Sequence, residues 1–213
     1  MKTENFYKLA QPDGWDFYTG NTINYREGIG KTVKCPRFNE NGELCSEAYL
    51  HASRGPDQCF VGAKIPCSAY LVAGMPIKED HDKCGFSELF IKEELLPEKL
   101  FQWDYKEACN PVHSFKVKPP KVDNKILDVL GKWASVGASV RASVRASVWD
   151  SVWAYIGGLF PNIKTWKFAE KLGENPWEPL TELWYAGYVP SFDGKIWRLH
   201  ACPKARIVHE FTP

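Results

Sequence analysis

A tetrapeptide repeat near the middle of the chain constrains the fold more than any other feature. From residue 134 to residue 157 the sequence reads ASVG, ASVR, ASVR, ASVW, DSVW and AYIG. In an α-helix a period of four places the valines one turn apart, with a drift of about 40° per step. The alanines lie about 200° away from the valines, so such a helix has two apolar ridges on opposite sides.

The same repeat is also compatible with a strand, because four is a multiple of two and both Val and Ser are poor helix formers. One strand of this length would span roughly 80 Å, whereas natural strands usually stop by about ten residues. A Pro-Pro pair precedes the repeat, Asp123 can cap a helix, and a Gly-Gly pair follows. We therefore predict one helix over about 123–156, with a hairpin broken at Gly137 as the alternative.

The predicted helix needs a packing partner, because a helix so rich in Ser and Val is not stable alone in water. The candidate partners are a second copy of the chain through the repeat helix, a host protein, or a small ligand. A candidate interaction surface lies on one helix face and consists of Arg141, Arg145, Trp149 and Trp153. Two arginines are too few to predict nucleic-acid binding.

Composition excludes some classes of protein. The formal net charge is +1, and 44% of the residues are hydrophobic, so the chain is not a basic nucleic-acid binder. No apolar run reaches the roughly 18 residues of a membrane span, and the N-terminus does not resemble a signal peptide. We expect a cytoplasmic protein without a membrane partner. The seven cysteines are accordingly expected to be reduced rather than paired in disulfides.

The N-terminal segment reads as an antiparallel β module, because short runs of strand-forming residues alternate with Gly, Pro, Asn and Asp turns. The best strand pair joins 67–72 to 75–77. Strands are predicted at residues 6–9, 15–18, 32–35, 49–52, 67–72, 75–77 and 86–94, and short helices or turns at 56–61 and 97–109.

The C-terminal segment is rich in aromatic residues and can build a small core. A helix is predicted at 178–186, followed by a hairpin whose turn is Ser-Phe-Asp-Gly and by a last strand at 206–211. The predicted fold class is α+β. Its three parts are an antiparallel β module at 1–118, a long central repeat helix at 119–158, and a small helix plus β-meander at 159–213.

Three elements precede the repeat in a fixed order. They are the run GWDFYTGNTINYREGIGKTVKCP from Gly14, the element YLHASRGPDQCF from Tyr49, and the turn DKCG from Asp82. Together with the Ala/Ser/Trp/Arg repeat, they resemble an uncharacterised family of phage, prophage and environmental viral proteins. The resemblance implies a helical repeat and, for a viral protein, the cytoplasm of the host cell. It implies no activity.

Candidate chemistry in the N-terminal segment centres on His51, which lies near Asp57 and Cys59 in the sequence and could act with them as a base and a nucleophile. Tyrosines and arginines nearby could complete a ligand pocket. The candidate ligand-binding residues are Tyr18, Tyr25, Arg26, His51, Arg54 and Asp57. A structural interpretation competes with this one: His51 would be a strand histidine bonded to the backbone, and Asp57 would cap a short helix.

No metal or cofactor site is predicted. The cysteines form no CxxC pair, and the sequence GIGK at 28–31 lacks the spacing of a phosphate-binding loop. The charged run at 80–83 is typical of a solvated hairpin turn. We therefore expect a non-catalytic binding or interaction protein of viral or mobile-element type. The alternative is a small-molecule or nucleotide-binding enzyme with a cleft around His51 and Arg54.

Overall fold

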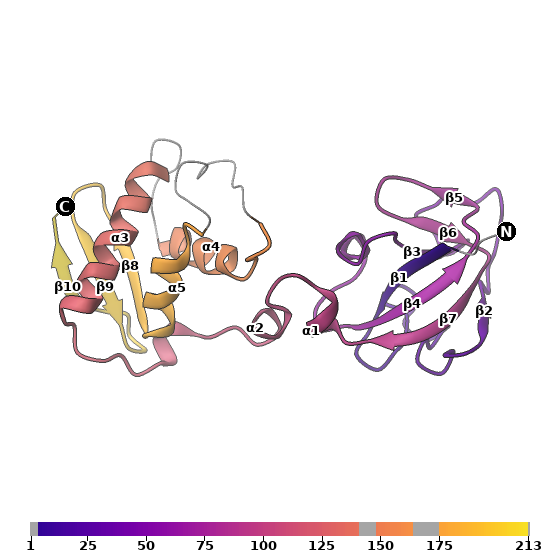
Figure 1. Cartoon of the computed structure of the whole chain (residues 1–213), viewed down its shortest axis with the longest axis horizontal. Helices are drawn as coiled ribbons and strands as arrows, with labels where there is room; N and C mark the ends of the chain where they lie inside the picture. Colours follow the sequence, from indigo (N-terminus) through magenta and orange to yellow (C-terminus); the bar gives the residue numbers. More distant parts are fainter. Residues whose placement is uncertain (1–3, 141–147, 164–174, 213) are drawn as a thin grey trace. The chain divides into compact units, whose positions relative to one another are not determined.

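The computed structural model describes residues 4–140, 148–163 and 175–212, with only the backbone at 137–140 and 148–150. The chain divides into two compact units, unit 1 (Met1–Phe101) and unit 2 (Gln102–Pro213) (Figure 1). Both contain antiparallel sheets and helices, which confirms the predicted α+β class. None of the helices in the described part of the chain combines the length and the hydropathy that crossing a bilayer requires.

Unit 1 is built from two antiparallel sheets. The larger has the strand order β1-β4-β7-β2 and the smaller the order β3-β6-β5. The strands are β1 Glu4–Ala10, β2 Thr32–Lys34, β3 Leu50–Ala52, β4 Ser68–Gly74, β5 Lys78–Glu79, β6 Cys84–Phe86 and β7 Glu88–Leu95. Two short helices complete the unit, the 3-10 helix η1 Asp57–Val61 and the α-helix α1 Pro97–Leu100.

Alternation of apolar and polar residues explains how the strands of unit 1 pack. On β7, Leu89 and Ile91 are buried whereas their neighbours in sequence are exposed, as expected for a strand with one face on the core. The core also joins the two sheets, because the rings of Phe6 on β1 and Phe86 on β6 meet edge to face at 4.9 Å between centroids. Next to this contact, Tyr7 and Ser53 exchange two backbone hydrogen bonds of 2.8 and 2.9 Å, which holds β1 beside the end of β3.

Two strand predictions in unit 1 are wrong. Residues 15–18 form no strand: Trp15 makes an isolated bridge to Asn24, and the chain then turns. The carboxylate of Asp16 accepts the backbone N–H groups of Tyr18 and Thr19 and so competes with strand pairing. Residues 75–77 do not pair with β4, which lies between β1 and β7. The strand that follows Gly74 is instead β5, which pairs with β6.

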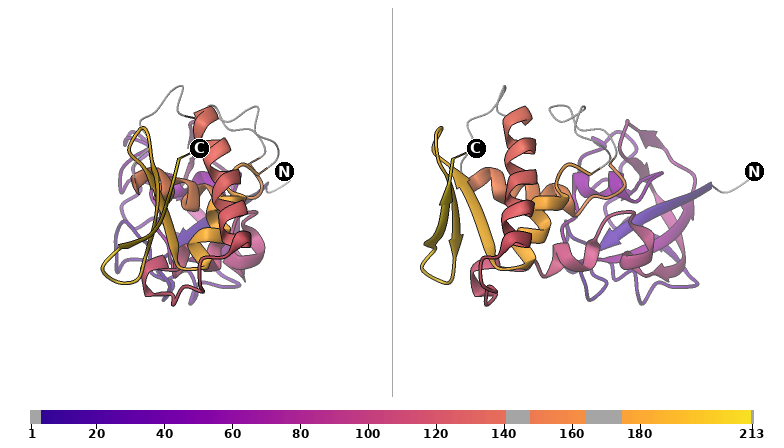
Figure 2. Two further views of the ribbon diagram at one scale, coloured as in Figure 1. Left: turned by 90° about the vertical axis from the view of Figure 1, so that its left-hand side faces the viewer. Right: turned by 60° about the vertical axis from the view of Figure 1, so that its left-hand side comes forward.

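Unit 2 consists of helices packed on a three-stranded meander with the order β10-β9-β8. The predicted C-terminal helix and meander are confirmed. The elements are α2 Tyr105–Cys109, the 3-10 helix η2 Ser114–Lys116, α3 Asn124–Val140, α4 Val148–Gly158, α5 Glu178–Tyr185, β8 Tyr188–Phe192, β9 Trp197–Ala201 and β10 Arg206–Phe211. Helices α3, α4 and α5 lie on the same side of the sheet (Figure 2), and their buried side chains share one apolar core with it.

The repeat forms two helices in the described residues rather than the single helix predicted over 123–156. As predicted, Asp123 caps the first, α3, by accepting the N–H of Ile126 at 3.0 Å. Gly137 lies within α3, so the hairpin alternative is wrong. Helices α3 and α4 run in different directions (Figure 1), and residues 141–147 lie outside the described part.

A physical reason for two helices lies in the repeat period. A ridge with a period of four drifts around a straight helix, so one long helix cannot keep the same ridge on one core. Two shorter helices each turn their own apolar face inward. The buried residues are Leu130, Trp133 and Ala134 on α3, and Ser151, Ala154 and Tyr155 on α4.

Candidate functional site

A pocket of about 380 Å³ lies in unit 1, and the residues around it come from β1, β3, η1 and the loops beside them. Tyr18 and His51, two of the six predicted ligand-binding residues, line it. Six of the lining residues have charged, titratable or thiol side chains. They are Lys8, Asp16, Cys45, His51, Cys59 and Lys83.

An ion pair with two largely buried side chains forms part of the pocket wall. The ammonium nitrogen of Lys8 lies 2.7 Å from Oδ2 of Asp16 and 5.0 Å from the ring centroid of the buried Tyr25. The second carboxylate oxygen, Oδ1, accepts the backbone N–H groups of Tyr18 at 2.9 Å and Thr19 at 3.0 Å. One oxygen of the Asp16 carboxylate is therefore bound by Lys8 and the other by the backbone.

Both members of this pair are charged at neutral pH. Burial raises the pKa of Asp16, but the charge of Lys8 and the two backbone N–H groups outweigh it and hold the pKa at about 2. Burial lowers the pKa of Lys8, and the neighbouring Tyr25 and Asp16 more than offset that effect, so the pKa lies above its ordinary value. Burial also raises the pKa of Tyr25 to about 12, which keeps its phenol neutral.

His51 lies on β3, opposite Gly85 on β6, and its ring is bonded to the backbone. The Nε2 atom contacts the carbonyl oxygen of Leu44. A carbonyl oxygen can only accept, so Nε2 carries the hydrogen and Nδ1 is the acceptor of the neutral ring. Burial lowers the pKa of His51, which favours that neutral form. The ring thus matches the strand histidine of the structural interpretation.

Two cysteines line the pocket in different surroundings. The sulfur of Cys59 lies 3.1 Å from the carbonyl oxygen of Tyr7, and burial raises the pKa of its thiol. Cys59 is therefore protonated at neutral pH and not an activated nucleophile. Cys45 is exposed, and the ammonium nitrogen of Lys83 lies 2.6 Å from its sulfur. Among the described residues, no three His, Cys, Asp or Glu side chains come together as metal ligands would.

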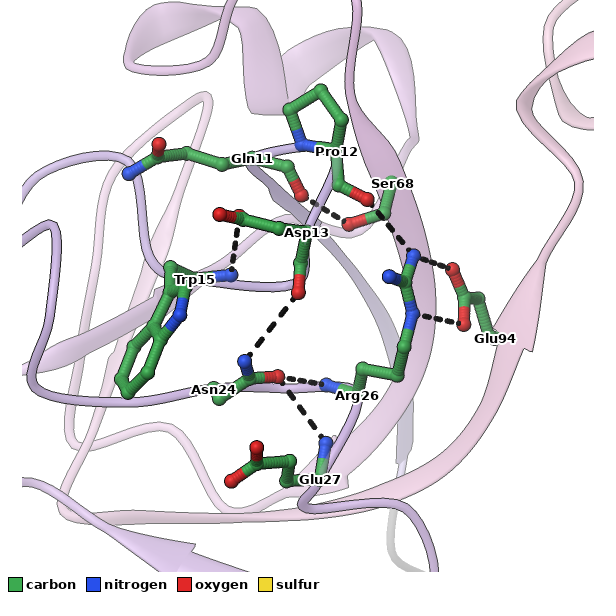
Figure 3. A network of polar contacts seen from close by, with 9 residues as sticks. All are labelled: Gln11, Pro12, Asp13, Trp15, Asn24, Arg26, Glu27, Ser68 and Glu94. Atoms are coloured by element: carbon green, nitrogen blue, oxygen red, sulfur yellow. Dashed lines mark hydrogen bonds and ion pairs between the residues drawn. The ribbon is translucent and has the colours of Figure 1, made fainter.

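Arg26 does not line the pocket, because its side chain is engaged elsewhere in unit 1. Its guanidinium donates to both carboxylate oxygens of Glu94 at 2.9 and 2.6 Å and to the carbonyl of Pro12 at 2.9 Å. The side-chain oxygen of Asn24 accepts the backbone N–H groups of Arg26 and Glu27. Figure 3 shows this network. Arg26 ties the loop after β1 to β7 and thereby has a structural role.

The remaining predicted ligand-binding residues also lie outside the pocket lining. Arg54 forms ion pairs with Glu4 and Glu79. Asp57 is the first residue of η1. The N-cap residue of this helix is Pro56, and no side chain forms a capping hydrogen bond there. Tyr25 is buried in the core, and its ring lies 5.0 Å from the ammonium nitrogen of Lys8 in the pocket wall.

The predicted interaction surface belongs to unit 2 and is described in part. Arg141 and Arg145 lie outside the described residues, and Trp149 is described by its backbone alone, within α4. Trp153 is the member of the surface whose side chain is described, and it is 67% exposed. The structure thus places one of the four side chains, and that one faces solvent.

Sequence reasoning missed part of the pocket, and one signal could have revealed it. In the alternation of β1, Lys8 shares a face with Phe6 and Ala10, which are buried. A lysine on a core face needs a carboxylate partner, so this position could have been singled out. The contact between Cys45 and Lys83 has no such signal, because the two residues are 38 positions apart.

Comparison of the chain with protein-family models, with curated proteins and with solved structures found no match in any of the three. The resemblance to a viral family therefore stays a prediction.

Proposed function

We propose that unit 1 is a non-catalytic binding module whose pocket takes a small organic molecule with a carboxylate or phosphate group. The observation that carries this proposal is the charge of the wall. Two lysines, Lys8 and Lys83, and one carboxylate, Asp16, line the pocket. Because His51 is neutral, the wall has a net positive charge that attracts an anionic group.

The size and the apolar part of the lining narrow the ligand class. A volume of about 380 Å³ is near the lower end of the roughly 300–1,000 Å³ of small-molecule pockets. Leu9, Phe17 and Val61 contribute apolar walls beside the charged groups. A compact molecule with an apolar or aromatic body and one anionic group suits this combination.

Three features favour binding over catalysis. The Nε2 atom of His51 is bonded to a backbone carbonyl, and no hydrogen bond among the described residues joins its ring to a thiol or hydroxyl. The pKa of Cys59 is raised by burial, which disfavours the thiolate that a nucleophilic mechanism needs. The enzyme alternative also placed Arg54 in the cleft, whereas Arg54 bridges two carboxylates outside the pocket lining.

Titration with benzoate and with its neutral analogue benzamide tests this proposal. Amide NMR spectra of the full chain, recorded with a reductant present, should show benzoate-dependent shifts at Cys45, Ser53, Gly62 and Lys83. Lys83→Gln should weaken benzoate binding about fivefold, the equivalent of about 1 kcal/mol.

The matched control is Lys92→Gln, because Lys92 bonds to Asn5 and does not line the pocket. That variant should bind benzoate like the parent. Equal shifts with benzamide and benzoate, or no shifts with either, would refute the proposal of an anion-binding pocket.

A second candidate function is contact with another protein chain, and one observation in unit 2 favours it. Trp153 exposes 67% of its side chain, and Ile156, three residues later on the same helix, is also exposed. Residues three apart are neighbours on a helix surface, and Trp is enriched at the energetic centres of protein interfaces. A second copy of the chain is the partner we propose for this face.

A further inference from the structure

The side chains of Cys45 and Lys83 approach each other more closely than hydrogen-bonded groups do. The nitrogen Nζ of Lys83 lies 2.6 Å from the sulfur of Cys45. Hydrogen bonds from N–H to oxygen measure about 2.7–3.2 Å, and sulfur is a larger atom than oxygen. The contact is therefore too short for an ordinary N–H···S hydrogen bond.

The backbone on both sides fixes this contact. Lys83 closes the turn between β5 and β6, where its N–H donates to Oδ1 of Asp80 at 2.8 Å. The two neighbours of Cys45 are also anchored, since the carbonyl of Leu44 accepts from His51 and the hydroxyl of Ser46 donates to the carbonyl of Glu43 at 2.6 Å. The amine and the thiol are thus held together by two separate parts of the fold, which favours a reaction between them.

We infer that Cys45 and Lys83 form an oxidative cross-link in which one oxygen atom is bonded to both the sulfur and the nitrogen. Two single bonds of about 1.5–1.7 Å that meet at about 110° place nitrogen and sulfur about 2.6 Å apart, which is the distance found here. A direct nitrogen–sulfur bond would be much shorter.

The reaction balances with dioxygen as the oxidant. The Lys83 ammonium first releases one proton to solvent. The S–H bond of Cys45 and one N–H bond of the resulting amine then break, and an S–O bond and an O–N bond form. Dioxygen accepts four electrons: one of its oxygen atoms becomes the bridge and the other leaves as water with the two hydrogens removed. Hydrogen peroxide gives the same bridge when two molecules react and three molecules of water leave. The exposure of Cys45 makes its sulfur accessible to either oxidant.

The cross-link would also change the pocket, a consequence that rests on the proposed function. Lys83 lines the pocket with its ammonium, and the bridged nitrogen no longer has that positive charge at neutral pH. Oxidation should therefore weaken the binding of an anion. The cross-link itself follows from the contact and does not depend on any ligand.

Peptide mass spectrometry of the full chain detects the cross-link directly. The protein is kept in air-saturated buffer or treated with hydrogen peroxide, and is then digested with trypsin without a reductant. Trypsin does not cleave at the modified Lys83, so the peptide 38–54 should be joined to the peptide 79–92. The joined mass should exceed the sum of the two peptides by about 14 Da, from one oxygen gained and two hydrogens lost. A dithiol reductant should release both peptides unmodified.

Three variants sharpen this test. Lys83→Arg keeps the positive charge but lacks the primary amine, and Cys45→Ser lacks the thiol, so neither should give the joined species. Cys84→Ser should still give it, because Cys84 lies in the same peptide but is not part of the bridge. A disulfide between Cys45 and Cys84 would leave Lys83 open to trypsin, so it would join the peptide 38–54 to the peptide 84–92, at about 2 Da below the sum of those two peptides.

Three results would overturn the inference. They are oxidation of Cys45 to its sulfinic or sulfonic acid without any joined peptide, a joined peptide with only the mass of a disulfide, and a joined peptide that persists in Lys83→Arg. The benzoate titration is carried out with a reductant, so its result does not depend on the cross-link. A negative result in either experiment therefore does not contradict the proposal that the other one tests.

Discussion

The ammonium group of Lys8 lies 2.7 Å from the carboxylate of Asp16, where the two side chains are only 12% and 10% exposed. Lys8 belongs to β1, whereas Asp16 is in the turn that follows this strand. A buried charge without its partner is strongly destabilising. This ion pair therefore both lines the pocket and stabilises unit 1.

Asp16→Asn should destabilise unit 1 by about 3–5 kcal/mol, because it leaves the Lys8 ammonium buried and unpaired. The double variant Lys8→Met with Asp16→Asn should lose less, because both charges are then absent. Urea unfolding, followed through amide NMR signals of unit 1, measures both. As a control, Glu47→Gln breaks the exposed pair with Arg37 and should change stability by less than about 1 kcal/mol. Equal losses for the single and double variants would contradict the prediction.

Acid should weaken unit 1 through the same carboxylate. The pKa of Asp16 is about 2 in the folded chain, against an ordinary value of 3.8. The unfolded state therefore takes up the proton first as the pH falls, and roughly 2 kcal/mol of stability should be lost between about pH 4 and pH 2. Urea midpoints measured across that range should fall. The free energy of unfolding of Asp16→Asn should depend less on pH over this range. If its pH dependence equals that of the parent, Asp16 is not the group responsible.

His51→Ala should destabilise unit 1 by about 1–3 kcal/mol, because the half-buried ring and its bond to the Leu44 carbonyl are lost. Since burial lowers the pKa of His51 in the folded chain, the parent should also lose stability as the pH falls below about 6.5. Urea unfolding at neutral pH gives the first effect. The exposed His81 provides the control, and His81→Ala should have almost no effect. A His51→Ala variant as stable as the parent would contradict a structural role for the ring.

Gly187→Ala should destabilise unit 2 more than Gly194→Ala. Both glycines have positive φ angles, +85° and +103°, so an alanine at either is strained by about 1–2 kcal/mol. A Cβ atom at residue 187 would also lie 2.8 Å from the carbonyl oxygen of Val117, whereas one at residue 194 meets nothing within 4 Å. Thermal unfolding of the two variants gives the comparison. Equal losses would mean that the chain near Val117 relaxes easily.

Self-association through α4 should depend on Trp153. Light scattering at high protein concentration should detect a dimer of the parent, and Trp153→Ser should weaken that dimer by at least about tenfold. Ile207→Ser is a suitable control, because Ile207 is also an exposed apolar residue of unit 2 but lies on β10. A parent that stays monomeric, or a control that weakens the dimer equally, would refute this role of Trp153.

The amino-acid sequence by itself determined the local elements of the fold. A short run of strand-forming residues before a turn signal identified β1, alternating residues identified β7, and the Asp123 cap marked the start of α3. These signals lie within a few residues of the element that they specify, so a single sequence contains them. The α+β class followed because the two kinds of periodicity occupy separate parts of the chain.

Only the tertiary structure decided the direction of the repeat helices and the chemistry of the pocket. The repeat has two apolar ridges, and the shared core of unit 2 selects the side of each helix that is buried. In unit 1, sheet pairing places His51 on β3 and Lys83 beside β6 next to the same pocket as Lys8 on β1. Contacts between distant residues depend on the register of strands and on the paths of loops, neither of which any short stretch of sequence specifies. For this reason the pairing of Cys45 with Lys83 could only be found in the folded chain.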